Sequence, residues 1–220
     1  MAGRFSLALQ NTLSIDEIAR LEAMSVCEKR LRREGFVRIA GVDEAGRGPL
    51  AGPVVAAACI LPEGALFASL NDSKQLQAGQ REMLFAQITA FPGIQYGIGK
   101  ASVAEIDRYN ILKATFLAMR RAVAELPVFP DYLLIDGNSF KSDLPYSYKT
   151  IIRGDDSCLS VACASIIAKV TRDRILNTYD QIFPQYGFKH HKGYPTREHK
   201  AAIKKFGLSL IHRRTFHFHR

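Results

Sequence analysis

The sequence predicts an α/β protein in which a mixed β-sheet is flanked by helices. The first observation is the order of segments: a helix, three short strands, a long helix, a fourth strand and further helices. The second is that the first strands follow one another through connections shorter than a usual helical crossover, which favours some antiparallel pairing. The third is the uninterrupted apolar stretch Val54–Leu61, typical of a strand covered on both faces. A sheet packed between helices accounts for all three.

The N-terminal half begins with a helix. Ser14-Ile15-Asp16-Glu17 is a capping box that opens it, and Gly35 is placed to stop it. Three strands and one polar helical stretch should follow. We expect the strands at Phe36–Val42, Val54–Leu61 and Ile94–Ala101, and the helical stretch at Ser73–Ala90.

The C-terminal half is mostly helical. Apolar residues at helical spacing predict one long helix over Val103–Leu126, which Pro127 ends. A fourth strand is expected at Tyr132–Ile135. A polar loop at Lys141–Lys149, a helix at Leu159–Phe183 and a helix near Thr196–Phe206 complete the prediction.

The positive charge of the chain is concentrated at one end. The net charge is +9, yet residues 184–220 alone hold nine Lys and Arg against one acid, Glu198. Such a distribution indicates a surface that faces a polyanion such as nucleic acid. A solvated basic tail explains the same charge equally well, so charge alone does not decide between the two.

The cysteines and apolar segments indicate a cytoplasmic protein. Cys27, Cys59, Cys158 and Cys163 form no CxxC pair and lie in apolar or helical surroundings, as reduced buried thiols do. That pattern favours a reducing compartment. We expect no signal peptide, because the first residues lack a continuous apolar region, and no membrane span.

Acidic residues follow two apolar strands. Asp43-Glu44 ends a strand and precedes a turn rich in glycine and proline, and Asp136 ends the fourth strand. Asp155 lies just before the Leu159 helix. Because ligands bind at the carboxyl ends of strands in α/β sheets, we expect these four carboxylates to converge. Adjacent anions need cations, and Mg²⁺ or Mn²⁺ suits oxygen ligands, so the pattern predicts a two-metal phosphodiester-cleaving site.

Two alternatives apply to these acids. A single aspartate at a strand end is often only a turn residue, and for Asp136 alone that interpretation is as good. In addition, successive strand residues point to opposite faces. Asp43 and Glu44 are therefore expected to face one metal site only if the strand breaks its pleat there.

The motifs resemble those of ribonuclease HII, the type 2 ribonuclease H family. The similarity spans residues 36 to 214, and an ordered set of segments carries it. These are Gly41–Pro53 (GVDEAGRGPLAGP), Asp72–Leu76 (DSKQL), Ile135–Gly137 (IDG), Ser160–Asp173 (SVACASIIAKVTRD), Tyr186–Tyr194 (YGFKHHKGY) with Thr196 and His199, and His212–Arg214 (HRR).

The resemblance implies a ribonuclease H-like fold with a five-stranded mixed sheet and a helical C-terminal part. It also implies an endonuclease that acts on RNA/DNA hybrids and on duplex DNA containing ribonucleotides. That enzyme would cut 5′ of a ribonucleotide and leave a 5′-phosphate and a 3′-hydroxyl, for removal of ribonucleotides in DNA replication and repair. The ligands of two Mn²⁺ or Mg²⁺ ions would be Asp43, Glu44, Asp136 and Asp155.

Substrate-binding residues are also implied by the resemblance. Backbone groups of Gly46-Arg47-Gly48 would read the 2′-hydroxyl, and glycines allow that close approach. Tyr194 would stack on the next sugar, although it can also be read as a half-buried core residue. Ser73 and Lys74, together with the basic C-terminal surface, would hold phosphates.

The chain departs from the family pattern in a few places. Arg153 stands where lysine is usual, and Cys163 where alanine is usual. Asp156 follows Asp155 directly, but spacing to the Ser165 motif favours Asp155 as the ligand. Asp173 is interpreted as structural, since it falls about five turns into its helix.

The expected organisation is an N-terminal helical extension (1–35), a catalytic core (36–183) and a basic helical segment (184–220) that contacts substrate. We expect a monomer, and the last residues show no sliding-clamp motif. His217 and His219 are too few to close a metal site. Two alternatives remain: a non-catalytic duplex-binding protein on the same fold, and another two-metal nuclease of the ribonuclease H-like superfamily.

Overall fold

The computed structural model describes residues 13–71, 73, 76–141 and 143–216. Its centre is a five-stranded sheet with the strand order β3-β2-β1-β4-β5. β1 pairs antiparallel with β2, and β2 with β3, while β1–β4 and β4–β5 are parallel. The predicted mixed sheet is therefore confirmed. The strands are β1 (Ile39–Ala45), β2 (Val54–Ile60), β3 (Gln95–Ala101), β4 (Tyr132–Asp136) and β5 (Ser147–Ile151).

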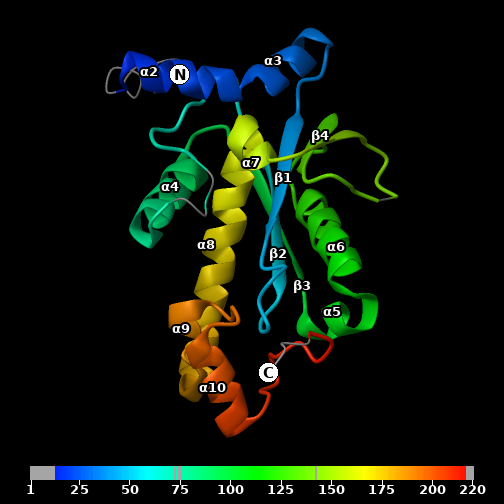
Figure 1. Ribbon diagram of the computed structural model, residues 1–220. Helices are drawn as coiled ribbons and strands as arrows, with labels where there is room; N and C mark the ends of the chain where they lie inside the picture. Colours follow the sequence, from blue (N-terminus) through cyan, green and yellow to red (C-terminus); the bar gives the residue numbers. More distant parts are fainter. Residues whose placement is uncertain (1–12, 72, 74–75, 142, 217–220) are drawn as a thin grey trace.

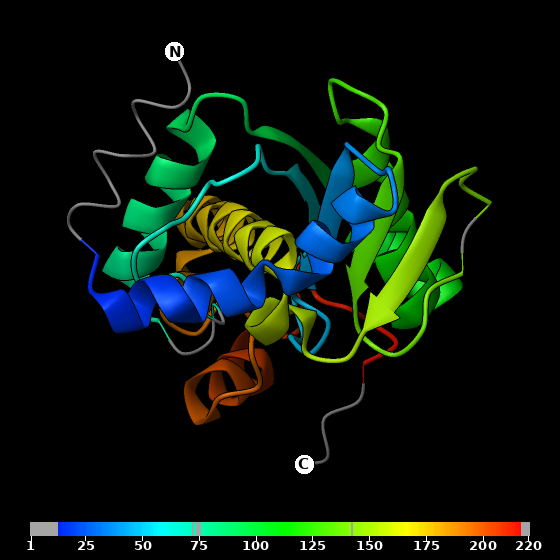
Figure 2. The same cartoon turned by 90° about the horizontal axis from the view of Figure 1, so that it is seen from above.

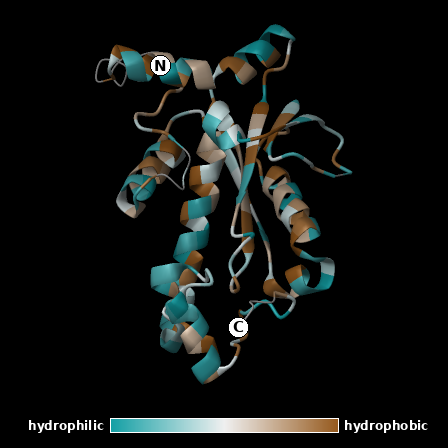
Figure 3. Cartoon of the chain, viewed as in Figure 1, coloured by the Kyte–Doolittle hydropathy of each residue, from teal (hydrophilic) through white to brown (hydrophobic). Residues whose placement is uncertain are grey.

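Helices cover both faces of the sheet (Figures 1 and 2). α6 (Ile111–Ala124) packs on one face. α8 (Leu159–Ile182) packs on the other, with α4 (Ala78–Ala90) beside it. Each face buries its own apolar cluster, and all seven residues of β2 are buried, as its uninterrupted apolar sequence predicts. Figure 3 shows hydrophobic residues along β1 and α6, and hydrophilic ones over much of α3 and the C-terminal helices.

The remaining helices lie at the two ends of the molecule. α2 (Ile15–Met24) and α3 (Val26–Arg33) cross one end, above the start of β1 (Figure 1). α9 (Phe188–His191) and α10 (Arg197–Phe206) lie at the other end, beside the last turns of α8. α5 (Val103–Tyr109), α7 (Gly154–Ser157) and η1 (Pro184–Tyr186) are short connecting elements.

α8 runs alongside β1, and this arrangement places its side chains at successive points of the strand. A Cβ on Gly41 would lie 2.2 Å from the backbone of Ser160, and one on Gly46 would lie 2.0 Å from Nε of Arg172. Five strand residues span roughly 16 Å and twelve helix residues roughly 18 Å. The two elements therefore stay in contact from the middle of β1 to the loop beyond it.

Several predicted boundaries were wrong. The predicted Val103–Leu126 helix is two helices, because Asn110 adopts a φ of 69° and its side chain caps α6 through the amide of Lys113. The N-terminal helix is likewise two helices, because α2 ends at Met24 and α3 begins after Ser25. β1 begins at Ile39, three residues later than expected, and α4 begins only at Ala78.

The predicted loop Lys141–Lys149 contains the start of β5. Ser147, Tyr148 and Lys149 are exposed, because the strand lies at the edge of the sheet and pairs on one side only with β4. An exposed edge strand has no apolar pattern by which it can be recognised. Among the described residues, no helix is both long enough and apolar enough to cross a membrane.

Candidate metal centre

Three carboxylates meet where β1 and β4 end. One oxygen from each of Asp43, Glu44 and Asp136 lies within 4.8 Å of the others. The parallel register of β1 and β4 runs to Val42 opposite Ile135, so Asp43 and Asp136 are the next residues on adjacent strands. Neighbours in register on parallel strands point to the same face. These two side chains are therefore brought together by the sheet itself.

Glu44 reaches the cluster without a break in the strand. β1 and β2 pair in an uninterrupted register from Ala40 to Ala45, so the expected break in the pleat was wrong. The pairing of β1 with β4 stops at Val42, so the edge of β1 is open beyond that point. The long side chain of Glu44 can thus approach Asp43 and Asp136 around this open edge.

Asp155 lies next to this cluster but is not one of the three mutually close ligands found among the described residues. It follows Gly154 in α7, whose amide donates a 2.7 Å hydrogen bond to Oδ1 of Asp136. Asp155 is buried and its charge raises the pKa of Asp43, whereas Asp156 is exposed. These observations favour Asp155 over Asp156 as a fourth carboxylate.

Electrostatic repulsion in the cluster is strong. Asp43 is buried, and burial raises its pKa well above its usual range, with further contributions from the charges of Glu44 and Asp136. A divalent cation bound by these carboxylate oxygens would offset both the cost of burying Asp43 and its repulsion by the neighbouring charges. The donor set consists of carboxylate oxygens alone, which fits Mg²⁺ or Mn²⁺.

Ser165 connects this cluster to the loop before α4. Its hydroxyl donates to the carboxylate of Asp43 and lies 2.9 Å from the hydroxyl of Ser73. Either hydroxyl can be the donor between the two serines. Ser73 is buried, and in this structure its hydroxyl contacts Ser165 inside the protein. Lys74, predicted with Ser73 to hold phosphate, lies outside the described residues.

The Gly46-Arg47-Gly48 loop is fixed by a buried arginine. Arg213 donates to the carbonyl oxygens of Gly46, Arg47 and Gly52 at 2.6, 2.9 and 3.0 Å. Gly46 has a φ of 99°, and its lack of a side chain leaves room for Arg172. The side chain of Arg47 points to Glu44, with Nη1 3.4 Å from Oε1.

Arg172 and Arg213 have structural roles that the sequence did not indicate, because an arginine is usually exposed. Arg172 donates to the carbonyl oxygens of Pro53 and Ala51 at 3.1 and 3.0 Å. Burial lowers the pKa of Arg172 to about 10 and that of Arg213 to about 9, so both remain charged at neutral pH. Arg213 is one of the nine Lys and Arg counted toward the basic segment 184–220, but it is buried and does not belong to that surface.

Tyr194 lies beside the same loop. A Cβ on Gly48 would lie 3.7 Å from Cε1 of Tyr194, and the tyrosine is 42% exposed. The Leu50 amide donates to the carbonyl oxygen of Gly193 at 2.8 Å, which ties the two segments together. The ring therefore lines the surface next to the loop, and a core role does not fit its exposure.

Three buried histidines form hydrogen bonds in and around the segment that contains Tyr194. His199 Nδ1 bonds the carbonyl oxygen of Tyr194 at 2.9 Å, and its Nε2 lies 3.0 Å from Nε2 of His212. Burial lowers the pKa of each of these two histidines to about 4. His191 bonds the carbonyl oxygen of Tyr186. All three histidines are buried, and each has a hydrogen-bond partner inside the protein.

The remaining sequence interpretations concern single residues. Asp173 pairs with Lys169 at 2.8 Å and with Arg81 at 3.8 Å, consistent with a structural role. All four cysteines are free thiols. His217 and His219, like Phe218 and Arg220 of the final segment considered for a clamp motif, lie outside the described residues.

Known proteins resemble the chain over most of its length. A family model described as Ribonuclease HII matches residues 40–219. Ribonuclease HII of Geobacter metallireducens is 56% identical, covering 86% of this chain and 88% of its own, and that of Syntrophotalea carbinolica is 54% identical, covering 86% and 90%. The crystal structure of ribonuclease H2 from Pyrococcus horikoshii superposes with a TM-score of 0.69 at 28% identity, covering 82% and 94%.

Proposed function

We propose that this chain, which belongs to the ribonuclease HII family and is a ribonuclease H endonuclease, acts on RNA/DNA hybrids and also cuts duplex DNA at single embedded ribonucleotides. Cleavage occurs on the 5′ side of the ribonucleotide and leaves a 5′-phosphate and a 3′-hydroxyl. In the cell this activity would remove ribonucleotides left in DNA by replication. The carboxylate cluster beside the glycine loop is the observation that carries the proposal.

Asp43, Glu44, Asp136 and Asp155 are proposed to hold two divalent ions, Mg²⁺ or Mn²⁺. Such ions supply activation of a water molecule and stabilisation of the leaving 3′-oxygen. The protein contributes the placement of the carboxylates. The sheet register sets Asp43 against Asp136, and Ser165 orients Asp43 by its hydrogen bond. The raised pKa of Asp43 supports a site that functions with cations bound.

Recognition of the ribonucleotide is assigned to the Gly46-Arg47-Gly48 loop and Tyr194. Arg213 binds the loop carbonyl oxygens from the protein side, so the opposite side of the loop can face the 2′-hydroxyl. Tyr194, adjacent to Gly48, would stack on the sugar that follows. Phosphates would contact Lys74, the Ser73 loop and exposed basic residues of the C-terminal segment, such as Lys189 and Lys204.

Product mapping on a DNA duplex with one ribonucleotide tests this proposal. The strand is labelled at its 5′ end in one sample and its 3′ end in another, and an all-DNA duplex of the same sequence is the control. With Mg²⁺ or Mn²⁺ we expect one cut 5′ of the ribonucleotide, a phosphatase-sensitive new 5′ end, and no cut with a chelator. Cleavage of the hybrid but not of the single-ribonucleotide duplex would contradict the finer specificity.

A further inference from the structure

Glu28 is a buried acid on α3, outside the residues that the family model matches. It is 6% exposed, and its Oε1 accepts two hydrogen bonds from Ser160, one from the backbone amide at 2.8 Å and one from the hydroxyl at 2.6 Å. Its Oε2 is buried and has no hydrogen-bond partner among the described atoms. A carboxylate is costly to bury, so its contact with Ser160 calls for an explanation.

Ser160 lies in the first turn of α8. The N-cap residue that precedes this 24-residue helix, Cys158, makes no side-chain capping bond. The first amides of a helix need acceptors, and a negative charge near them is favourable. Glu28 supplies that acceptor from a different part of the chain. The N-terminal extension thus caps the longest helix of the described structure.

The start of α8 also fixes the candidate metal centre. α7, which contains Asp155, ends directly before α8, and the Cys158 amide donates to the Gly154 carbonyl oxygen at 2.8 Å. On the other side, Ser160 packs against Gly41, where a Cβ would overlap its backbone at 2.2 Å. Ser160 is therefore where the helix packs directly against β1, at Gly41, two residues before Asp43.

We propose that Glu28 is a positioning residue for the metal centre: acting through Ser160, it sets the place of Asp155 relative to the other carboxylates. This inference rests on the proposed metal-dependent function. Glu28 touches neither metal nor substrate, and its effect passes through the α7–α8 junction alone. The N-terminal extension therefore contributes to metal affinity.

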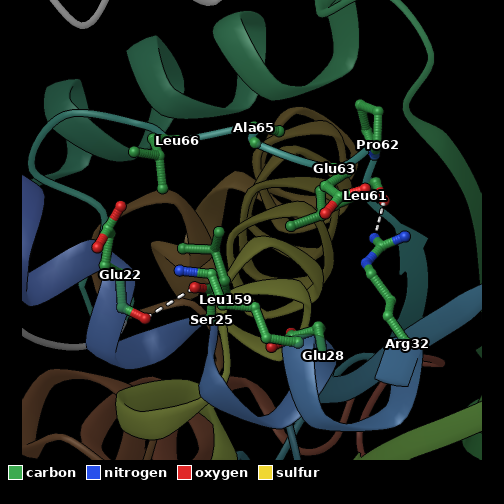
Figure 4. Close-up of a pocket in the computed structure, with 12 residues that line it drawn as sticks. Glu22, Ser25, Glu28, Arg32, Leu61, Pro62, Glu63, Ala65, Leu66 and Leu159 are labelled. Carbon is green, nitrogen blue, oxygen red and sulfur yellow. Dashed lines mark hydrogen bonds between the residues drawn. The ribbon is translucent and has the colours of Figure 1, made fainter. Parts of the chain in front are cut away.

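Glu22 provides a matched control. It lies on α2, is exposed, and lines the same cavity of about 210 Å³ as Glu28 (Figure 4). Replacing either acid by glutamine removes one charge from the same cavity. Only Glu28 bonds Ser160, so the two positions separate a local charge effect from the capping effect.

The test measures Mn²⁺ binding to the protein without substrate, by isothermal titration calorimetry, and the Mn²⁺ concentration for half-maximal cleavage. We expect Glu28→Ala to weaken Mn²⁺ binding on the order of tenfold, as loss of an outer-shell support does. Glu28→Gln, which keeps an acceptor for the Ser160 amide, and Glu22→Gln should stay within about twofold of wild type. Circular dichroism checks that each variant is folded.

A double variant distinguishes positioning from general weakening. If Glu28 acts through Asp155, Glu28→Ala should change Mn²⁺ affinity little when Asp155→Asn is already present. Independent, additive losses would overturn the inference, as would wild-type affinity in Glu28→Ala. Should Glu28→Ala not fold, Glu28→Asp replaces it, because the shorter acid withdraws the acceptor from Ser160. A wild-type protein that neither binds Mn²⁺ nor cleaves would refute the proposed function itself.

Discussion

The amide of Gly154 donates a 2.7 Å hydrogen bond to Oδ1 of Asp136, so the first residue of α7 is attached to the carboxylate that ends β4. This bond brings Asp155 next to the cluster although 18 residues separate Gly154 from Asp136 in the chain. An amide oxygen can accept the same bond. Neutral substitutions at Asp136 therefore test its charge while leaving its structural contact in place.

Asp136→Asn is expected to lower the rate of cleavage by at least about 100-fold, because it removes the charge of a proposed metal ligand. Affinity for the duplex, measured by fluorescence anisotropy without divalent ions, should stay within about twofold, since the basic surface is unchanged. Asp43→Asn should behave in the same way. Normal turnover by either variant would refute the assigned metal ligands.

Asp155 and Asp156 form an adjacent pair that differs in burial. Asp155→Asn should weaken Mn²⁺ binding on the order of tenfold or more, whereas Asp156→Asn, exposed to solvent, should leave it unchanged. Calorimetric titration of both variants makes the comparison. A larger loss in Asp156→Asn would show that the fourth ligand was assigned one residue too early.

Tyr194→Ala should reduce cleavage at a single ribonucleotide on the order of tenfold, because stacking contacts contribute about 1–3 kcal/mol. Tyr194→Phe keeps the ring and should retain most of the activity. Affinity for an all-DNA duplex should change little in either variant. Equal losses of cleavage and general affinity would argue against a stacking role.

Gly46→Ala combines two costs. Its φ of 99° is unfavourable for any residue with a side chain, and its new Cβ would lie 2.0 Å from Nε of Arg172. Gly35→Ala is the matched control, since Gly35 has a φ of 97° and a Cβ there would have no atom within 4 Å. We expect Gly46→Ala to lower the free energy of unfolding by about 1–3 kcal/mol more than Gly35→Ala, measured in urea. Similar losses in both would show that the loop simply moves aside.

The His199–His212 pair predicts a loss of stability in acid. Burial lowers both pKa values from 6.5 to about 4, so the unfolded chain binds protons more readily between these limits. Their contribution is therefore complete above pH 6.5 and decreases as the pH falls toward 4, by at most about 1.4 kcal/mol per pH unit for each histidine. Urea unfolding at several pH values measures this slope. His212→Gln should reduce it, whereas His190→Gln, at an exposed position, should not.

Much of the sheet could be predicted because buried strands carry their own apolar signal. Asp43 and Asp136 could be proposed as ligands for the same reason, since each follows such a strand. β5 could not be found from its residues, because an exposed edge strand has no such signal. The break at Asn110 depends on a positive φ, which residue spacing does not reveal.

The roles of the two buried arginines depend on tertiary structure. Arg172 and Arg213 bond backbone carbonyl oxygens of residues more than a hundred positions away, and carbonyls are identical at every position of a sequence. Counting charges therefore assigned Arg213 to the solvent-facing surface. In the sequence, the only indication that these two arginines have a specific role was that both lie in the ordered motifs.

The contact of Arg213 with the Gly46 loop has a consequence for biosynthesis. The loop emerges from the ribosome early, yet the residue that binds its carbonyl oxygens follows 166 and 167 positions later. The backbone bridge between Ala51 and His212 closes the same long loop. The carbonyl oxygens of Gly46 and Arg47 gain this donor only once Arg213 has been translated, so the loop takes its final conformation only after both segments have left the ribosome.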